Sequence, residues 1–188
     1  MWASSQVSSS IYIVRVFTTE VVGVVALLSA MMILLSTIFS VGLNFSVQHF
    51  ISYYIGKNDP GSLRGVVKEI SIILILVSIL AIVFMWFSSP AFAYLFFHTY
   101  RYIDIIRIMG FAVVANLGSS VTGGMVLGLQ KFRVNALISI AYTVVMYSAI
   151  VILLQFIVNP LVVVVGWTAG YTLGALLFYT HVTRRIRG

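Results

Sequence analysis

The sequence predicts an all-α fold: a polytopic membrane helical bundle with about six transmembrane helices, in a single domain that covers residues 1–188. Two features of the composition lead to this class, because 61% of the residues are hydrophobic and only 8% are charged, against about 25% charged residues in soluble domains. The apolar stretches are continuous and do not alternate, which argues against a β-barrel. No soluble segment is longer than a loop, so we expect no separate globular domain.

Uncharged runs and turn signals delimit the expected spans. Residues 21–56 carry no formal charge, but their apolar character fades at Gly42, so an amphipathic extension to about Ile55 should follow the second span. Residues 134–183 are also uncharged and are too many for one crossing, so Asn159–Pro160 should divide them into two spans. The expected spans are about residues 3–18, 21–45, 68–88, 106–129, 133–157 and 161–182.

Two of these spans have unusual ends. The third should stop at Ser88–Pro90, and the aromatic segment AFAYLFFHTYRY that follows, residues 91–102, is typical of the headgroup level of a membrane. The first, residues 3–18, is weak because it starts with many serines and has a short apolar core that contains Arg15. It lacks the basic start and the cleavage site of a signal peptide.

The positive charges predict the orientation, because cytoplasmic loops of membrane proteins are enriched in Lys and Arg. Eight of the 11 basic residues fall on one side of the expected topology, whereas Arg15, Arg101 and Arg107 fall on the other. Both termini should therefore lie in the cytoplasm, and the protein should lie in the cytoplasmic membrane. Loop bias then explains the net charge of +7, and we expect no nucleic-acid partner. The eight residues are Lys57, Arg64, Lys68, Lys131, Arg133, Arg184, Arg185 and Arg187.

Small residues recur at helical spacing in the fourth and the last expected spans. Such faces allow helices to approach each other closely, either within the chain or at a dimer seam. They are Ser120, Gly124 and Gly128 in the fourth span and Gly166, Gly170 and Gly174 in the last.

Polar residues form faces on three of the expected spans. They could make hydrogen bonds between helices, or they could line a wet cavity, and the sequence favours neither alternative. They are Ser29, Ser36, Ser40 and Asn44 in the second span, Asn116 and Thr122 in the fourth, and Asn135, Ser139 and Tyr142 in the fifth.

Catalytic and metal-binding patterns are absent from the sequence, so we expect neither an enzyme nor a bound cofactor or metal. The chain has no cysteine, and its histidines, His49, His98 and His181, stand apart from other potential ligands. There is no zinc-protease motif, nucleophile elbow or P-loop. None of the four carboxylates falls at mid-membrane, which argues against a drug antiporter coupled to protons or sodium ions.

Several short motifs resemble those of the Wzx-type polysaccharide-export flippases, which share a superfamily with multidrug and toxin extruders and with the peptidoglycan lipid flippase. An acidic-Gly turn at Glu20–Gly23 precedes the long second helix, and a Gly-Leu pair follows at Gly42–Leu43. A GKND loop at Gly56–Asp59 and the pair Leu63–Arg64 come next. The stretch LGLQKFRVNALISIAYTV, residues 127–144, is similar to the join between the fourth and fifth helices of that family.

The resemblance implies a fold like one lobe of a two-lobed flippase that works by alternating access. It implies a central cavity for a lipid-linked glycan, in which the Arg15 guanidinium would bind phosphate and Asn44 and Asn116 would donate to sugar hydroxyls. An arginine near the bilayer centre costs roughly 2.5 to 3.5 kcal/mol on insertion scales. Arg15 could instead extend to the outer headgroups or pair with Glu20.

The expected partners are membrane lipids, the lipid-linked glycan as substrate, and a second lobe or a second copy of the chain. Three other roles remain open from the sequence. One is a six-helix substrate-binding subunit of a multi-component importer of small molecules. The second is a lobe of an antiporter similar to the multidrug extruders. The third is a truncated gene product with only a structural or assembly role.

Overall fold

A computed structural model describes residues 19–40, 42–57, 60–157 and 159–187. These residues form helices and contain no strand, which confirms the all-α prediction. The first expected span, residues 3–18, and Arg15 within it lie outside the described residues, so the number of spans stays a prediction. The helices are α2 (Thr19–Ser40), α3 (Leu43–Gly56), α4 (Pro60–Phe97), the short 3-10 helix η1 (Tyr100–Tyr102), α5 (Ile103–Gly128), α6 (Phe132–Leu154) and α7 (Leu161–Arg187).

Five helical segments within the described part of the chain are long and apolar enough to cross a membrane. The chain is therefore a multi-pass membrane protein. The five segments are Val22–Ser40, Gly61–Phe97, Tyr100–Gly128, Phe132–Leu154 and Leu161–Arg184.

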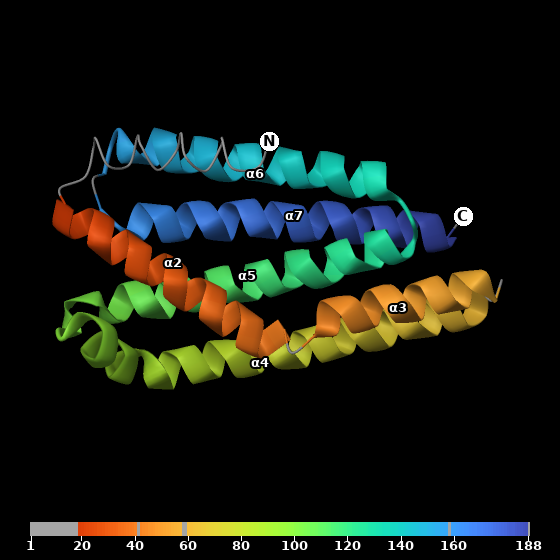
Figure 1. The fold of residues 1–188 in the computed structure, drawn as a ribbon, viewed down its shortest axis with the longest axis horizontal. Coiled ribbons are helices and arrows are strands. Elements are labelled where there is room, and N and C mark those ends of the chain that lie inside the picture. The colour runs from red at the N-terminus through yellow and green to blue at the C-terminus, as the bar shows by residue number, and fades with distance from the viewer. Residues whose placement is uncertain (1–18, 41, 58–59, 158, 188) are drawn as a thin grey trace.

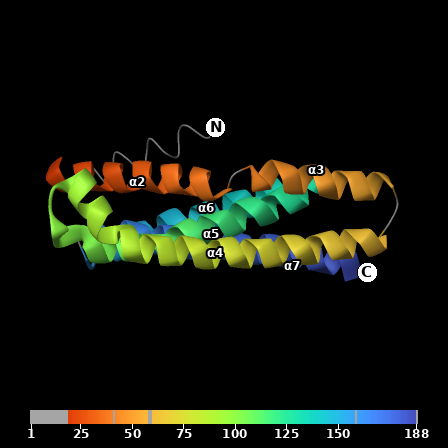
Figure 2. The same cartoon turned by 90° about the horizontal axis from the view of Figure 1, so that it is seen from below.

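Helix α5 is the centre of the bundle, because it packs against α2, α3, α4 and α7 (Figure 1). Helix α6 lies outermost and packs chiefly against α7. Figure 2 shows that α2 and α3 lie on one side of the other helices. Buried apolar side chains fill the contacts along α5: Leu28, Met85 and Met109 belong to a cluster at its first half, and Ile51 and Met125 belong to another at its second half.

The loops that carry most of the basic residues lie at one end of the bundle. The α3–α4 connection, the α5–α6 loop and the C-terminal end of α7 are found there, whereas η1 and the start of α5 are found at the opposite end (Figure 1). Lys57, Lys131 and Arg133 are thus separated from Arg101 and Arg107, in agreement with the expected charge asymmetry. Which end faces the cytoplasm stays a prediction.

The helix is interrupted at Gly42, between α2 and α3 and inside the expected span of residues 21–45. Gly42 has φ +72° and ψ +5°, a left-handed conformation that glycine adopts without the steric cost of a side chain. Helix α2 therefore ends at Ser40, and α3 begins at Leu43 as a separate helix.

The expected end of the third span at Ser88–Pro90 is wrong, because α4 continues through Pro90 to Phe97. The aromatic segment after Pro90 is therefore largely helical, and its position at the headgroup level stays a prediction. With 38 residues, α4 is about 57 Å long at a rise of about 1.5 Å per residue. It exceeds the hydrocarbon core of about 30 Å.

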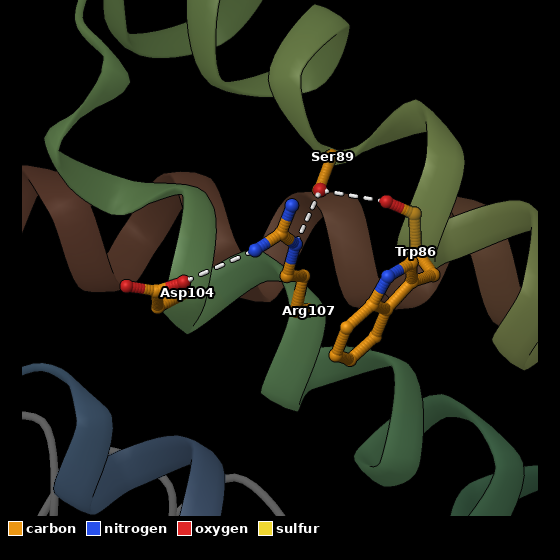
Figure 3. Close-up of polar contacts among 4 residues, drawn as sticks. All are labelled: Trp86, Ser89, Asp104 and Arg107. Atoms are coloured by element: carbon orange, nitrogen blue, oxygen red, sulfur yellow. Dashed lines mark hydrogen bonds and ion pairs between the residues drawn. The ribbon is translucent and has the colours of Figure 1, made fainter.

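A side-chain hydrogen bond explains how α4 accommodates the proline. Pro90 has no N–H to donate to the carbonyl oxygen of Trp86, four residues earlier. The hydroxyl of Ser89 donates to that oxygen instead, at 3.0 Å (Figure 3). Ser89 is fully buried and also accepts a hydrogen bond from Nε of Arg107 on α5, at 3.2 Å.

Arg107 on α5 contacts three side chains, of which Ser89 and Trp86 belong to α4 and Asp104 belongs to α5. Besides Ser89, it contacts Asp104, whose Oδ1 lies 3.4 Å from the guanidinium nitrogen, and the ring of Trp86, whose centroid lies 4.9 Å from the guanidinium carbon (Figure 3). A cation above an aromatic face is attracted by the ring quadrupole. The arginine thus stabilises the end of the bundle where α4 and α5 meet.

The small-residue faces pack within the chain, which confirms the first of the two alternatives drawn from the sequence. A Cβ added at Gly128 would lie 2.8 Å from Cβ of Ile51 on α3, and one added at Gly174 would lie 2.8 Å from Oγ of Ser119 on α5. A Cβ added at Gly166 or Gly170 would clash with side chains of α6. These glycines allow α3 to approach α5, and α7 to approach both α5 and α6.

The role of Ser89 can be tested by a double substitution. Ser89→Ala should lower the free energy of unfolding by about 1 to 3 kcal/mol, because it leaves the partly buried Trp86 carbonyl unpaired. Pro90→Ala restores an N–H for that carbonyl, so the cost of Ser89→Ala should be about 1 kcal/mol smaller in the Pro90→Ala background. Denaturation in mixed detergent micelles would measure the free energy of unfolding of the wild type, the two single variants and the double variant. Additive effects would contradict the hydrogen-bond replacement.

Candidate functional site

A polar cavity of about 320 Å³ lies among α3, α5, α6 and α7. Its lining combines side-chain amides, hydroxyls, aromatic rings and glycines. Among the described residues, no charged side chain lines it. The lining residues are Asn44, Asn116, Ser119, Ser120, Gly123, Gly124, Leu127, Asn135, Ser139, Tyr142, Tyr171 and Phe178.

Helical periodicity brings these residues to one place. On α5 the lining residues run from Asn116 to Leu127 at spacings of three or four, which keeps them on one face. On α6, Asn135, Ser139 and Tyr142 follow the same rule. The α5 face consists mostly of serine and glycine, whose small side chains leave the space between the helices open.

Helix α7 forms the floor of the cavity. Helices α5 and α6 both pack extensively against α7 but only lightly against each other, so a space remains between them. Gly174 makes the close approach of α7 possible, since a Cβ at that position would lie 2.8 Å from both Ser119 on α5 and the ring of Tyr142 on α6. The two sides of the cavity are thus held apart at a fixed distance by a third helix.

Some polar groups of the cavity lie beside one another. The hydroxyl of Tyr171 lies beside the side chain of Asn116, and that of Tyr142 lies beside Ser139 and Ser119. Asn44 differs, because its buried Oδ1 has no hydrogen-bond partner among the described residues and lies against Gly124. A buried amide oxygen without a donor is costly, and this oxygen is enclosed in the contact between α3 and α5.

The structure brings together two of the three site residues that the sequence predicted. Asn44 on α3 and Asn116 on α5 line the same cavity, although 71 residues separate them in the chain. Arg15 lies outside the described residues. The roles of all three in binding stay predictions.

Three of the polar residues fit neither interpretation drawn from the sequence, because they bond within their own helix. Ser29 and Ser40 donate to carbonyls of α2, at 2.8 Å and 3.0 Å, and Thr122 donates to a carbonyl of α5 at 2.6 Å; none of the three lines the cavity. Asn116 and Asn135 line the cavity instead.

Sequence reasoning missed Tyr171 and Phe178 as cavity residues. Their spacing of seven places them on one face of α7. The glycines in the same helix suggested only close packing. A signal was present, because a tyrosine and a phenylalanine beside a glycine face can border a space that the glycines leave.

An apolar groove of about 550 Å³ lies on a different face of the α5–α7 pair. Ile108, Phe111 and Leu176 are among its lining residues, and the hydroxyl of Thr168 donates to the Val164 carbonyl within its own helix, at 2.8 Å. The helix pair therefore has a polar side and an apolar side. In the described residues, no group of three or more His, Cys, Asp or Glu side chains could hold a metal ion.

Comparison with protein families gives one match, to the family described as "Polysaccharide biosynthesis protein", over residues 8–187. No curated protein and no solved structure matches the chain. The matched residues include every helix that lines the cavity and nearly the whole chain.

Single cysteines would test whether the cavity contains water, and the natural absence of cysteine leaves no background reaction. Ser120→Cys and Ser139→Cys should react quickly with a membrane-impermeant, water-soluble maleimide in detergent-free nanodiscs, because the reactive thiolate forms in contact with water. Ile140→Cys is the control, since Ile140 is 60% exposed on the outside of α6 and should face lipid. Equal, slow labelling at all three positions would mean that the polar groups only bond to one another.

Proposed function

The chain belongs to the polysaccharide biosynthesis protein family, and on that premise we propose that it is a flippase-type transporter, or a lobe of one, that moves lipid-linked oligosaccharide or polysaccharide precursors across the cytoplasmic membrane. The proposal assigns it a transport role and no catalytic one. Family membership leaves the importer-subunit alternative without support. The multidrug-antiporter alternative is disfavoured because no carboxylate lines the cavity among the described residues.

One observation carries the proposal: a cavity lined by amides and hydroxyls lies between helices that are otherwise apolar. A glycan has many hydroxyl groups, each of which loses hydrogen bonds to water when it enters a bilayer. Polar groups inside a bundle replace those bonds, while the lipid tail of the substrate stays in the surrounding membrane.

Three residues receive roles in this proposal. Asn44 and Asn116 contact sugar hydroxyls, since an amide group can both donate and accept hydrogen bonds. Arg15 binds the phosphate that joins the sugar to its lipid, because the guanidinium fork matches two phosphate oxygens.

The position of the cavity along the helices supports a direction of entry. Its α6 residues, Asn135, Ser139 and Tyr142, belong to the first half of that helix, which follows Lys131 and Arg133. The basic loops are expected in the cytoplasm. We therefore assign entry of the substrate to the cytoplasmic side, with a second lobe or a second copy of the chain closing the cavity and membrane lipids surrounding both.

The transport proposal predicts that Asn116→Leu slows movement of a lipid-linked oligosaccharide in reconstituted vesicles by about tenfold or more, because an unpaired sugar hydroxyl costs about 1 to 3 kcal/mol. Gln155→Leu is the matched control, since this amide is exposed at the end of α6. Movement would be followed by protection of the sugar from an added lectin. Equal rates for the two variants would contradict a role for the cavity.

The role of Arg15 predicts a graded series. Arg15→Lys keeps the charge but loses the planar fork, and Arg15→Ala loses both, so transport should fall in the order wild type, Lys, Ala at equal protein level. If Arg15 only reaches the outer headgroups, Lys should substitute fully. If it pairs with Glu20, Glu20→Gln should be as damaging as Arg15→Ala, and the double change should cost little more. Unimpaired transport by Arg15→Ala would contradict the phosphate contact.

A further inference from the structure

We propose that the polar cavity is a subsite for uncharged sugar rings, that it discriminates against acidic sugars, and that Asn135 takes part in this selection. The inference rests on the proposed flippase function and adds to it the chemical class of the sugar. Three properties of the lining lead to it: its charge, its hydrogen-bonding groups and its aromatic rings.

The first property is the absence of charge, since no Lys, Arg, His, Asp or Glu lines the cavity among the described residues. Lys131 and Arg133, which precede Asn135 in the chain, are exposed at the start of α6 and do not belong to the lining. A sugar carboxylate that enters this space loses hydration and gains no opposite charge from the described lining, which is unfavourable, while Arg15 is assigned to the phosphate in the proposal above. A neutral sugar avoids this cost.

The second property is the mixture of donors and acceptors. Asn44, Asn116 and Asn135 come from three different helices, and each carries a carbonyl oxygen and an NH₂ group. Asn116 lies beside Tyr171, and Asn135 lies near Gly123. A sugar hydroxyl is itself both a donor and an acceptor, so it can satisfy either half of such an amide.

The third property is an aromatic wall formed by Tyr142, Tyr171 and Phe178. The ring centroids of Tyr142 and Tyr171 lie 5.9 Å apart, and those of Tyr142 and Phe178 lie 6.3 Å apart. The C–H groups on one face of a sugar ring carry partial positive charge and pack favourably against the negative face of an aromatic ring. The cavity volume of about 320 Å³ equals that of about ten water molecules at about 30 Å³ each. This volume is comparable to the space that one sugar ring occupies.

The apolar groove on the other face of α5 and α7 is the contrasting environment within the same helix pair. Its lining includes Ile108, Phe111 and Leu176. These apolar side chains are suited to a hydrocarbon chain, whereas the polar side chains of the cavity are not. The polar cavity is therefore assigned to the sugar and not to the lipid tail.

Binding of three probes to the full chain in nanodiscs tests the inference. The probes share one prenyl diphosphate: one carries no sugar, one carries a neutral hexose disaccharide, and one carries the same disaccharide with a hexuronic acid in place of one hexose. The neutral form should bind about tenfold more tightly than the acidic form at neutral pH, and more tightly than the lipid without sugar. Native mass spectrometry would measure the three affinities.

Asn135→Lys provides a test that a folding defect would not imitate. It introduces a cation into the lining, so the preference should reverse in favour of the acidic probe. Gln155→Lys, on the exposed end of α6, should leave the preference unchanged.

The possible outcomes separate the two proposals. Equal affinity for the neutral and acidic probes, or an unchanged preference in Asn135→Lys, would overturn the inference, while transport of the precursor would still support the flippase. Failure to bind or to move any of the three probes would overturn the proposed function, and the sugar subsite with it.

Discussion

The lack of water in the hydrocarbon core is the constraint on which the structure depends, because each polar group there needs a partner inside the protein. Most of the backbone meets this need in long helices. Where Pro90 removes an N–H, the Ser89 hydroxyl supplies a replacement donor and Arg107 fixes that hydroxyl in place. Ser29 and Thr122 donate to their own helices for the same reason. The wall of the cavity contains an exception, since the buried Oδ1 of Asn44 accepts no hydrogen bond among the described residues.

The same glycines that tighten the bundle also create its hollow. Because Gly170 and Gly174 let α7 approach α6 and α5 closely, the two neighbours lie against α7 rather than against each other. Side chains on their facing surfaces then border a space. On α5 these are small residues, such as Ser120 and Gly123, which do not fill it. Close packing at one contact and open space at the next thus have a common cause in the sequence of α7.

Much of this arrangement follows from the sequence, and the exceptions have physical reasons. Composition and continuous apolar runs were sufficient for the all-α membrane fold, and helical spacing identified Asn44 and Asn116, which share a cavity. Pro90 was misinterpreted as the end of a span because its compensation comes partly from Arg107, on another helix, and sequence spacing does not reveal that contact. Tyr171 was missed because a polar aromatic residue beside glycines has the same pattern whether it packs or borders a cavity. For Arg15, the sequence leaves a phosphate, the outer headgroups and Glu20 as alternative partners.

The left-handed residue between α2 and α3 separates two different packing environments. Helix α3 is attached to α5 through Gly128, whose carbonyl accepts a hydrogen bond from Ser52 at 3.1 Å, whereas α2 packs in a different apolar cluster. The carbonyl of Gly42 accepts a hydrogen bond from the backbone N–H of Ser46 at 3.1 Å and so belongs to the first turn of α3. The position of Asn44 is therefore set by the contact of α3 with α5 and not by a continuation of α2.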